Sequence, residues 1–157
     1  MKRRLPEAVR QVLANLSEAF TTPIQEYGGA VLAGQPTIIE RHLALFPGDP
    51  TALESFVNHL HIEDLAGGFL GVKDADRLVL LAIGRALIHV WAERMRQLPR
   101  AREILFFLGG ADTVSLRFHV FRGEKAAWLD LTSPGFIRDE GFEVYLANGE
   151  GIRKIAP

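Results

Sequence analysis

One short stretch of the chain gathers residue types that can bind a metal. It contains His59, His61, Glu63 and Asp64. Imidazole and carboxylate groups are ligands of zinc and iron. The two histidines, however, fall at the end of an expected helix, where side chains two positions apart point about 200° away from each other, and where histidine is favoured electrostatically. We therefore predict neither a metal site nor a cofactor.

Two other patterns that could support catalysis are weak. Gly67, Gly68 and Gly71 precede a helix, as in a phosphate-binding loop, but the Gly-Lys-Ser/Thr ending is missing. Asp74 and Asp76 would also place negative charge where a phosphate should bind. No serine stands in a Gly-x-Ser-x-Gly motif, and the chain has no cysteine to serve as nucleophile or thiolate ligand. The chain thus carries no recognisable catalytic signature, which favours a non-catalytic protein and leaves an enzyme as the alternative.

The best candidate for a functional surface is one face of an expected β-hairpin. Alternating apolar and polar residues predict strands over Thr113–Arg122 and Ala126–Thr132, joined by a tight turn at Gly123-Glu124. That turn would place His119 opposite Trp128 and Arg117 opposite Asp130. The outer face of the hairpin would then present five candidate binding residues, which are Arg117, His119, Phe121, Trp128 and Asp130.

This face has three interpretations. Tryptophan and arginine are enriched in interaction hot spots, so an exposed face would bind a protein partner or a second copy of the chain. A loop from Pro134 to Gly141, or an N-terminal segment, would instead cover it. In the third interpretation the face is the wall of a small-molecule pocket, in which Arg117 binds an anion, His119 moves a proton, and Arg85 and His89 contribute from a helix.

The candidate residues belong to elements that pack around one long helix. The longest apolar-periodic stretch of the chain predicts this central helix over Asp74–Leu98. Its expected core stripe is Val79, Leu80, Ile83, Ala86, Leu87, Val90 and Trp91, and its opposite face is also largely apolar. A helix of this kind is buried on nearly every side, so we expect layers on two flanks. Arg85 should meet a carboxylate, and Gly84 should mark the close approach of another backbone.

The remaining elements follow from caps, turns and periodicity. Two Thr-x-x-Glu motifs predict capped helices that pair and cover the second face of the central helix. Glu103–Leu108 is apolar on both faces, which is typical of a strand covered on both sides. The other expected elements are a helix over Pro6–Phe20, the two capped helices over Thr37–Phe46 and Thr51–His61, and a hairpin of Phe142–Ala147 and Ile152–Ile155 around Asn148-Gly149.

Composition limits the classes of function. The 157 residues suit a single domain, and the net charge of −1 gives no general attraction to nucleic acid or anionic membrane.

We predict one α+β domain over residues 1–157, with N-terminal helices and the central helix packed on a C-terminal antiparallel meander of four to five strands. The preferred function is that of a cytoplasmic binding protein of the regulatory, adaptor or toxin-neutralising type, with a protein partner or a homodimer. The alternative is a small-molecule-binding protein or enzyme with a pocket between sheet and helices.

Overall fold

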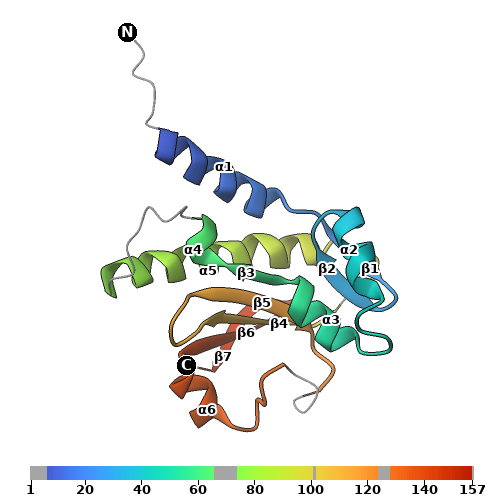
Figure 1. Cartoon of the computed structure of the whole chain (residues 1–157). Helices are drawn as coiled ribbons and strands as arrows, with labels where there is room; N and C mark the ends of the chain where they lie inside the picture. Colours follow the sequence, from blue (N-terminus) through green and yellow to red (C-terminus); the bar gives the residue numbers. More distant parts are fainter. Residues whose placement is uncertain (1–6, 66–73, 101, 124–127, 157) are drawn as a thin grey trace.

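The computed structural model describes residues 7–65, 74–100, 102–123 and 128–156. Its helices are α1 (Glu7–Thr21), α2 (Pro36–Leu43), α3 (Pro50–Val57), α4 (Ile62–Leu65), α5 (Asp74–Met95) and α6 (Pro134–Asp139). Its strands are β1 (Ile24–Tyr27), β2 (Ala30–Ala33), β3 (His59–His61), β4 (Ile104–Gly109), β5 (Ser115–Val120), β6 (Phe142–Asn148) and β7 (Gly151–Ala156). Five strands form an antiparallel sheet toward the C-terminus, which confirms the predicted α+β class (Figure 1).

Strand β4 is the centre of the sheet, whose order is β3-β5-β4-β6-β7. All six residues of β4 are buried, as the apolar stretch Glu103–Leu108 predicts for a strand covered on both faces. The order is not sequential, because β6 returns to β4 instead of β5. Strand β3, which precedes α5 in the chain, pairs with the other side of β5. The sheet therefore ends in β3 at one edge and β7 at the other.

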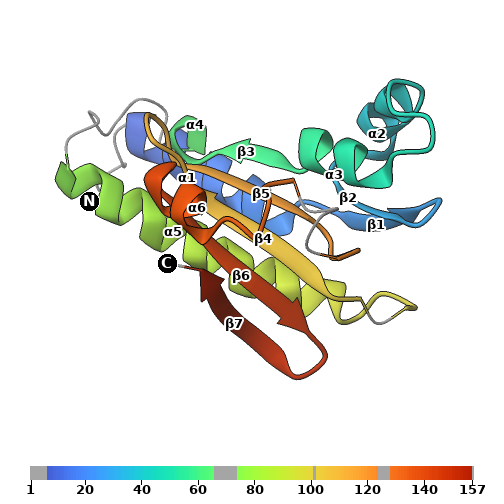
Figure 2. The same ribbon diagram turned by 90° about the horizontal axis from the view of Figure 1, so that it is seen from below.

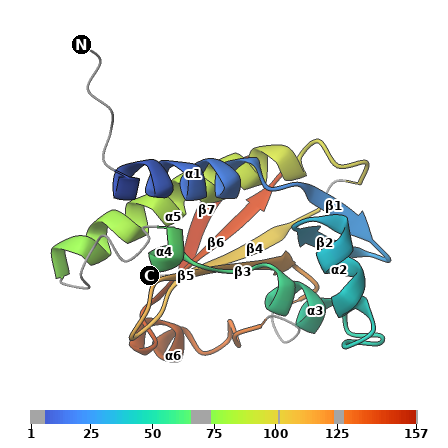
Figure 3. The same cartoon turned by 45° about the horizontal axis from the view of Figure 1, so that its top comes forward.

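Helix α5 lies between the sheet and α1, which confirms that it is covered on two flanks (Figures 1 and 3). Ile88 and Trp91 are buried in the main core, and the indole Nε1 of Trp91 donates a 3.0 Å hydrogen bond to the Ala19 carbonyl of α1. The helices that cover this flank are α1 and α4. The predicted cover by the α2–α3 pair is wrong, because α3 packs on β2 and β5 instead and α2 packs on α3.

Three details of α5 differ from the sequence interpretation. Val79 and Ala86 were expected in the buried stripe, yet both are exposed. The buried row instead runs through Leu80, Leu87, Ile88, Trp91, Ala92 and Met95. Gly84 does mark a close approach, but of a side chain rather than a backbone, since a Cβ there would lie 2.3 Å from Cδ1 of Leu108. The side chain of Leu108 on β4 therefore packs directly against α5 at Gly84, where a larger residue would clash.

Strands β1 and β2 form a hairpin that the sequence analysis missed. Its turn, Gly28-Gly29, has φ angles of +55° and +90°, which glycine adopts without strain. Helices α2 and α3 lie at this end of the molecule (Figure 2). The predicted capping boxes do not form: Gln35 begins α2 without a side-chain cap, and the carboxylate of Asp49 caps α3 by accepting from the Ala52 N–H at 2.9 Å.

Glu54 of α3 joins this hairpin to the main sheet. Its side chain is fully buried, and its two oxygens accept from the backbone N–H groups of Val31 in β2, at 2.7 Å, and Val120 in β5, at 3.1 Å. Arg122 neutralises the carboxylate, with Nη1 2.5 Å from Oε2. A buried charge that is both paired and hydrogen-bonded in this way can be tolerated in a core.

Asn58, directly after α3, makes the second connection. Its Nδ2 donates to the carbonyls of Val31, at 2.8 Å, and Phe118, at 3.1 Å, while its Oδ1 accepts from the Ala33 N–H at 2.8 Å. Glu54 and Asn58 therefore take the place of a backbone ladder between β2 and β5.

The final hairpin forms as predicted, with its turn shifted by one residue. Asn148 pairs with Gly151, so the two loop residues are Gly149 and Glu150. The Asn148 side chain accepts from the N–H groups of Glu150, at 2.9 Å, and Gly151, at 3.2 Å. The ladder between β6 and β7 contains a bulge, because Lys154 pairs with Tyr145 and Ala156 with Val144, which leaves Ile155 as the extra residue.

Candidate functional site

The predicted hairpin around Gly123 does not form. Strand β5 pairs with β3 on one side and β4 on the other, so both of its edges are in use. Residues 128–133 form bends and turns instead of a strand, and residues 124–127 lie outside those described. The proposed opposite pairs of the hairpin are therefore wrong; Val120, for example, pairs with Ile104.

His119 and Trp128 nevertheless meet, through a hydrogen bond outside any ladder. The Trp128 backbone N–H donates to Nε2 of His119 at 3.0 Å, and Nδ1 of the same ring lies 2.9 Å from the Val120 carbonyl. These contacts assign the proton to Nδ1 and make the ring neutral. Burial lowers the pKa of His119, and its ring stacks on Phe107 with centroids 5.4 Å apart. The geometry uses both ring nitrogens, so His119 has none left for moving a proton.

Arg117, two residues before His119 on the same face of β5, also contacts Trp128. Its guanidinium carbon lies 4.4 Å from the centre of the Trp128 ring, a cation–π contact. Its Nη1 donates to the Ser55 carbonyl near the end of α3 at 2.8 Å, where a cation is electrostatically favoured. Burial lowers the pKa of Arg117. These contacts make Arg117 a clamp between α3 and residues 128–133.

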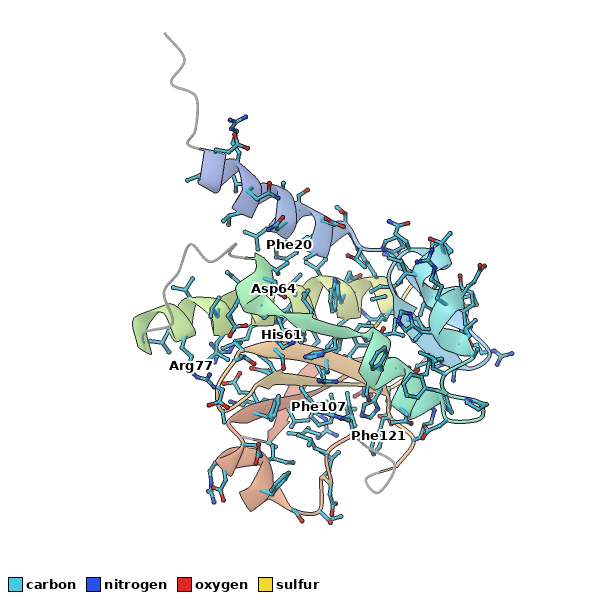
Figure 4. The ribbon with its side chains drawn as sticks, viewed as in Figure 1. Phe20, His61, Asp64, Arg77, Phe107 and Phe121 are labelled. Carbon is cyan, nitrogen blue, oxygen red and sulfur yellow. The ribbon has the colours of Figure 1, made fainter. Side chains whose placement is uncertain are left out.

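The face that carries these residues is covered, as the second sequence interpretation has it. Figure 4 shows Phe107 on the side of the sheet that faces α6, opposite α5. On this outer face, Trp128, Leu129, Leu131 and Ile137 pack against Leu105, Phe107, Val144 and Leu146 in a second apolar cluster. Asp130 is exposed, and its carboxylate accepts from the Thr132 N–H and hydroxyl at 2.9 and 2.6 Å.

The histidine pair lies on a strand, not at a helix end. Helix α3 stops at Val57, and His59 and His61 stand on β3 with their ring centroids 4.4 Å apart. Burial, followed by the charges of Arg117 and His61, lowers the pKa of His59 to about 4. Within the described ranges, no group of three histidine or acidic side chains is placed to hold a metal ion. Gly67, Gly68 and Gly71 lie outside those ranges.

Arg85 and His89 do not share a pocket with Arg117 and His119. Both project from exposed positions of α5, on the other side of the sheet. Arg85 meets the carboxylate that the sequence analysis expects, since its Nη2 lies 2.7 Å from Oε1 of Glu143 on β6. The core between the Arg85–His89 pair and the Arg117–His119 pair is filled by apolar side chains, which include Leu87, Trp91, Phe106 and Phe118. The four side chains therefore cannot act on one ligand.

A hollow of about 380 Å³ opens on the outer face instead. Most of its described lining residues are apolar, although polar atoms make up nearly half of the surface that they expose; the apolar residues include Leu105, Phe121, Leu131, Ile137, Leu146 and Ile155. Phe121 is the member of the predicted set that reaches it. Among the described lining residues Arg153 is the charged one, and it makes no ion pair with any described residue. Ile155 is 39% exposed, so the apolar lining continues to the surface.

No protein-family model, curated protein or solved structure matches this chain. In the part of the chain that the structure describes, no helix is long and apolar enough to cross a membrane.

The described lining of the hollow holds none of the side chains that commonly act as a general acid, base or nucleophile. Its lining combines aliphatic and aromatic side chains with one arginine, and no carboxylate, histidine or hydroxyl nucleophile is among the described lining residues. General acid–base chemistry requires such groups within hydrogen-bond reach of a substrate. An apolar lining with one cation instead suits binding of an apolar group that carries a neighbouring negative charge.

Proposed function

We propose that this protein is a non-catalytic binding protein that takes apolar side chains of a protein partner into the hollow on the outer face of its sheet. The observation that carries the proposal is the hollow itself, of about 380 Å³, whose described lining residues are apolar except for Arg153. Apolar surface that stays open in this way commonly marks an interaction site. Phe136 on α6, next to the lining residue Ile137, is itself 51% exposed and would extend the apolar surface.

The predicted binding residues keep a part in this proposal. Arg117 and His119 fix Trp128 by the contacts given above, and Trp128 begins the segment whose Leu131 lines the hollow. Asp130 lies exposed on that segment. These residues therefore shape and border the site, while Phe121 contacts the partner directly.

The cellular setting is part of the proposal. The nearly balanced charge of the chain is in keeping with a protein that binds neither nucleic acid nor membrane, and the proposed location is the cytoplasm. The partner is another protein; a second copy of the chain is the competing possibility, which the state of association of the wild type in analytical ultracentrifugation separates.

Selection of short random peptides displayed on phage tests the proposal. Peptides selected on the wild-type protein should lose about tenfold or more in affinity, about 1.4 kcal/mol, on Ile155→Asp, which puts a charge in the lining. The control is Leu78→Asp, at a 68% exposed position of α5 on the other side of the sheet, which should leave their binding unchanged. Failure to select any peptide, or equal binding to both variants, would reject the hollow as the binding site.

A further inference from the structure

Strand β7 is an open edge beside the hollow. It is the last strand of the sheet, and it pairs only with β6 among the described strands. Asn148 and Gly151 lie opposite each other and close the two-residue turn. In an antiparallel ladder, residues whose backbone groups face the neighbouring strand alternate with residues whose groups face away from it. Counted from the closing pair, the N–H and C=O groups of Ile152 and Lys154 therefore face away from β6. These backbone groups are ready to pair with another strand.

The side chains along this edge are basic. Arg153 is exposed and has no acidic partner among the described residues. Lys154 reaches Glu143 on β6 at 3.0 Å, but Glu143 also binds Arg85. Two cations thus share one carboxylate, and Arg153 adds a third positive charge. The free edge therefore has an excess of positive charge that an acidic strand would neutralise.

We infer that the β7 edge binds an extended acidic segment of the partner, which adds to the sheet as a sixth strand. Acidic residues of that segment would lie opposite Arg153 and Lys154, and an apolar residue opposite Ile152. This inference rests on the proposed function, because Arg153, Ile155 and Ala156 of β7 also line the hollow. A strand that pairs with β7 would run along the hollow and place apolar side chains into it.

A second copy of the chain fits this edge poorly. In the antiparallel register that pairs the outward backbone groups of Ile152 in each copy with those of Lys154 in the other, the Arg153 side chains of the two chains lie opposite each other. Like charges directly opposite each other destabilise a strand pair. The charge of the edge therefore selects an acidic partner and opposes pairing with itself.

The first test asks whether the backbone of the ligand pairs with β7. The probe is a fluorescent synthetic peptide built on the sequence Ile-Glu-Glu-Ile with a flanking valine at each end. Two modified peptides carry N-methyl groups on alternate amides, one on the odd and one on the even positions. A strand adds through one of its edges only, so one modified peptide should lose binding and the other should keep it, by fluorescence anisotropy.

Each other result of this test overturns the strand addition. Equal binding of both modified peptides would show that side chains alone hold the ligand, which leaves the hollow as a binding site and rejects the paired edge. Loss of both, or no binding of the unmodified peptide, would also reject the paired edge. The phage selection tests separately whether the hollow is a binding site, because it uses random peptides and does not require an acidic strand.

The second test asks whether charge selects the ligand. Arg153→Glu should weaken binding of the acidic peptide by about tenfold, and binding should also weaken as salt is added. The control is Arg41→Glu, at an exposed position of α2. Equal effects of the two variants would reject selection by the edge. A wild-type dimer that Arg153→Glu dissociates, seen by analytical ultracentrifugation, would assign the edge to a second copy and overturn the inference.

Discussion

The two edges of the five-stranded sheet are finished in different ways. At the β5 side, β3 pairs with Ser115, Leu116 and Arg117, and the side chains of Glu54 and Asn58 hydrogen-bond to the rest of the strand. At the β7 side, no described strand or helix side chain takes up the outer backbone groups. Proteins commonly cover, shorten or charge their sheet edges to prevent association.

The contrast shows what is needed to cover an edge. At the β5 side, the closed edge, the cover consists of two buried polar side chains, an ion pair to Arg122 and a second hairpin. At the open edge there is only a bulge and two basic side chains, of which Arg153 has no acidic partner among the described residues. The closed edge is thus structural, while the open edge keeps its hydrogen-bonding capacity for a ligand.

The largest expected effect comes from breaking the closed edge at Glu54. Glu54→Ala removes the ion pair to Arg122, which keeps its bonds to the Gly29 and Val120 carbonyls, and leaves two buried backbone N–H groups without their acceptor. Loss of one partner of a buried ion pair costs about 3–5 kcal/mol, measured as the free energy of unfolding in urea. The matched control at the open edge is Glu143→Ala, whose ion pairs are partly exposed, and which should cost about 1 kcal/mol or less. Equal losses would contradict the structural contrast.

Asn58→Ala should have the next largest effect. It removes three hydrogen bonds and leaves the carbonyls of Val31 and Phe118 and the N–H of Ala33 unpaired. Buried backbone groups without partners cost about 1–3 kcal/mol each, and partial relaxation should limit the total loss to about 3 kcal/mol. Urea unfolding measures this loss, and amide hydrogen exchange should show β2 opening before β4. A uniform change over the whole sheet would argue against a local connection.

Acid should weaken the closed edge before the open one. The pKa of His59 on β3 is lowered to about 4 from an ordinary 6.5 by burial and by the charges of Arg117 and His61. At Glu143, burial alone would raise the pKa, but hydrogen bonds from Arg85, Tyr145 and Lys154 lower it to about 2 from an ordinary 4.5. Both groups release protons on folding, so each stabilises the protein above its unfolded pKa and loses that contribution as the pH falls.

The pH windows separate the two edges. His59 should lose its contribution between pH 6.5 and 4, and Glu143 between pH 4.5 and 2. Urea unfolding of His59→Gln should therefore show a smaller loss of stability from pH 7 to pH 5 than the wild type. Some loss should remain, because burial lowers the pKa of His119 as well. Glu143→Gln should follow the wild type in this range and differ only in stronger acid.

Arg153→Glu should have the smallest effect on stability. The side chain is exposed and makes no ion pair with a described residue, so the free energy of unfolding should change by no more than about 0.5 kcal/mol. The same substitution is expected to weaken peptide binding strongly. A large loss of stability would show that Arg153 holds the fold, and would remove the distinction between a structural and a binding edge.

Local patterns were sufficient where an element is specified by its own residues. The spacing of apolar residues gave α1, α5 and the buried strand β4, and the Asn148-Gly149 signal located the last hairpin to within one residue. The predicted carboxylate partner of Arg85 exists as Glu143, although the pair is partly exposed rather than buried. These features depend on periodicity, turn chemistry and the cost of an unpaired charge.

Elements that depend on a distant partner were not predictable in the same way. His59–His61 become a strand because β5 pairs with them, and nothing within His-Leu-His itself distinguishes that strand from a helix end. The alternation around Trp128 resembles a strand, but both edges of β5 are already occupied, so the segment packs as a loop. The hollow follows from that packing. A single sequence carries no direct signal for it, apart from apolar residues such as Ile155 in a strand of otherwise mixed polarity.

The connection through Glu54 and Asn58 also sets an order of assembly. Glu54 meets Val31 across 23 residues of chain, whereas Asn58 meets Phe118 across 60. Shorter loops close first because they lose less chain entropy, so residues 24–58 can form a unit before β5 arrives. We therefore expect the same two side chains to receive β5 afterwards, with the docking of residues 24–58 onto the sheet as a late step in folding.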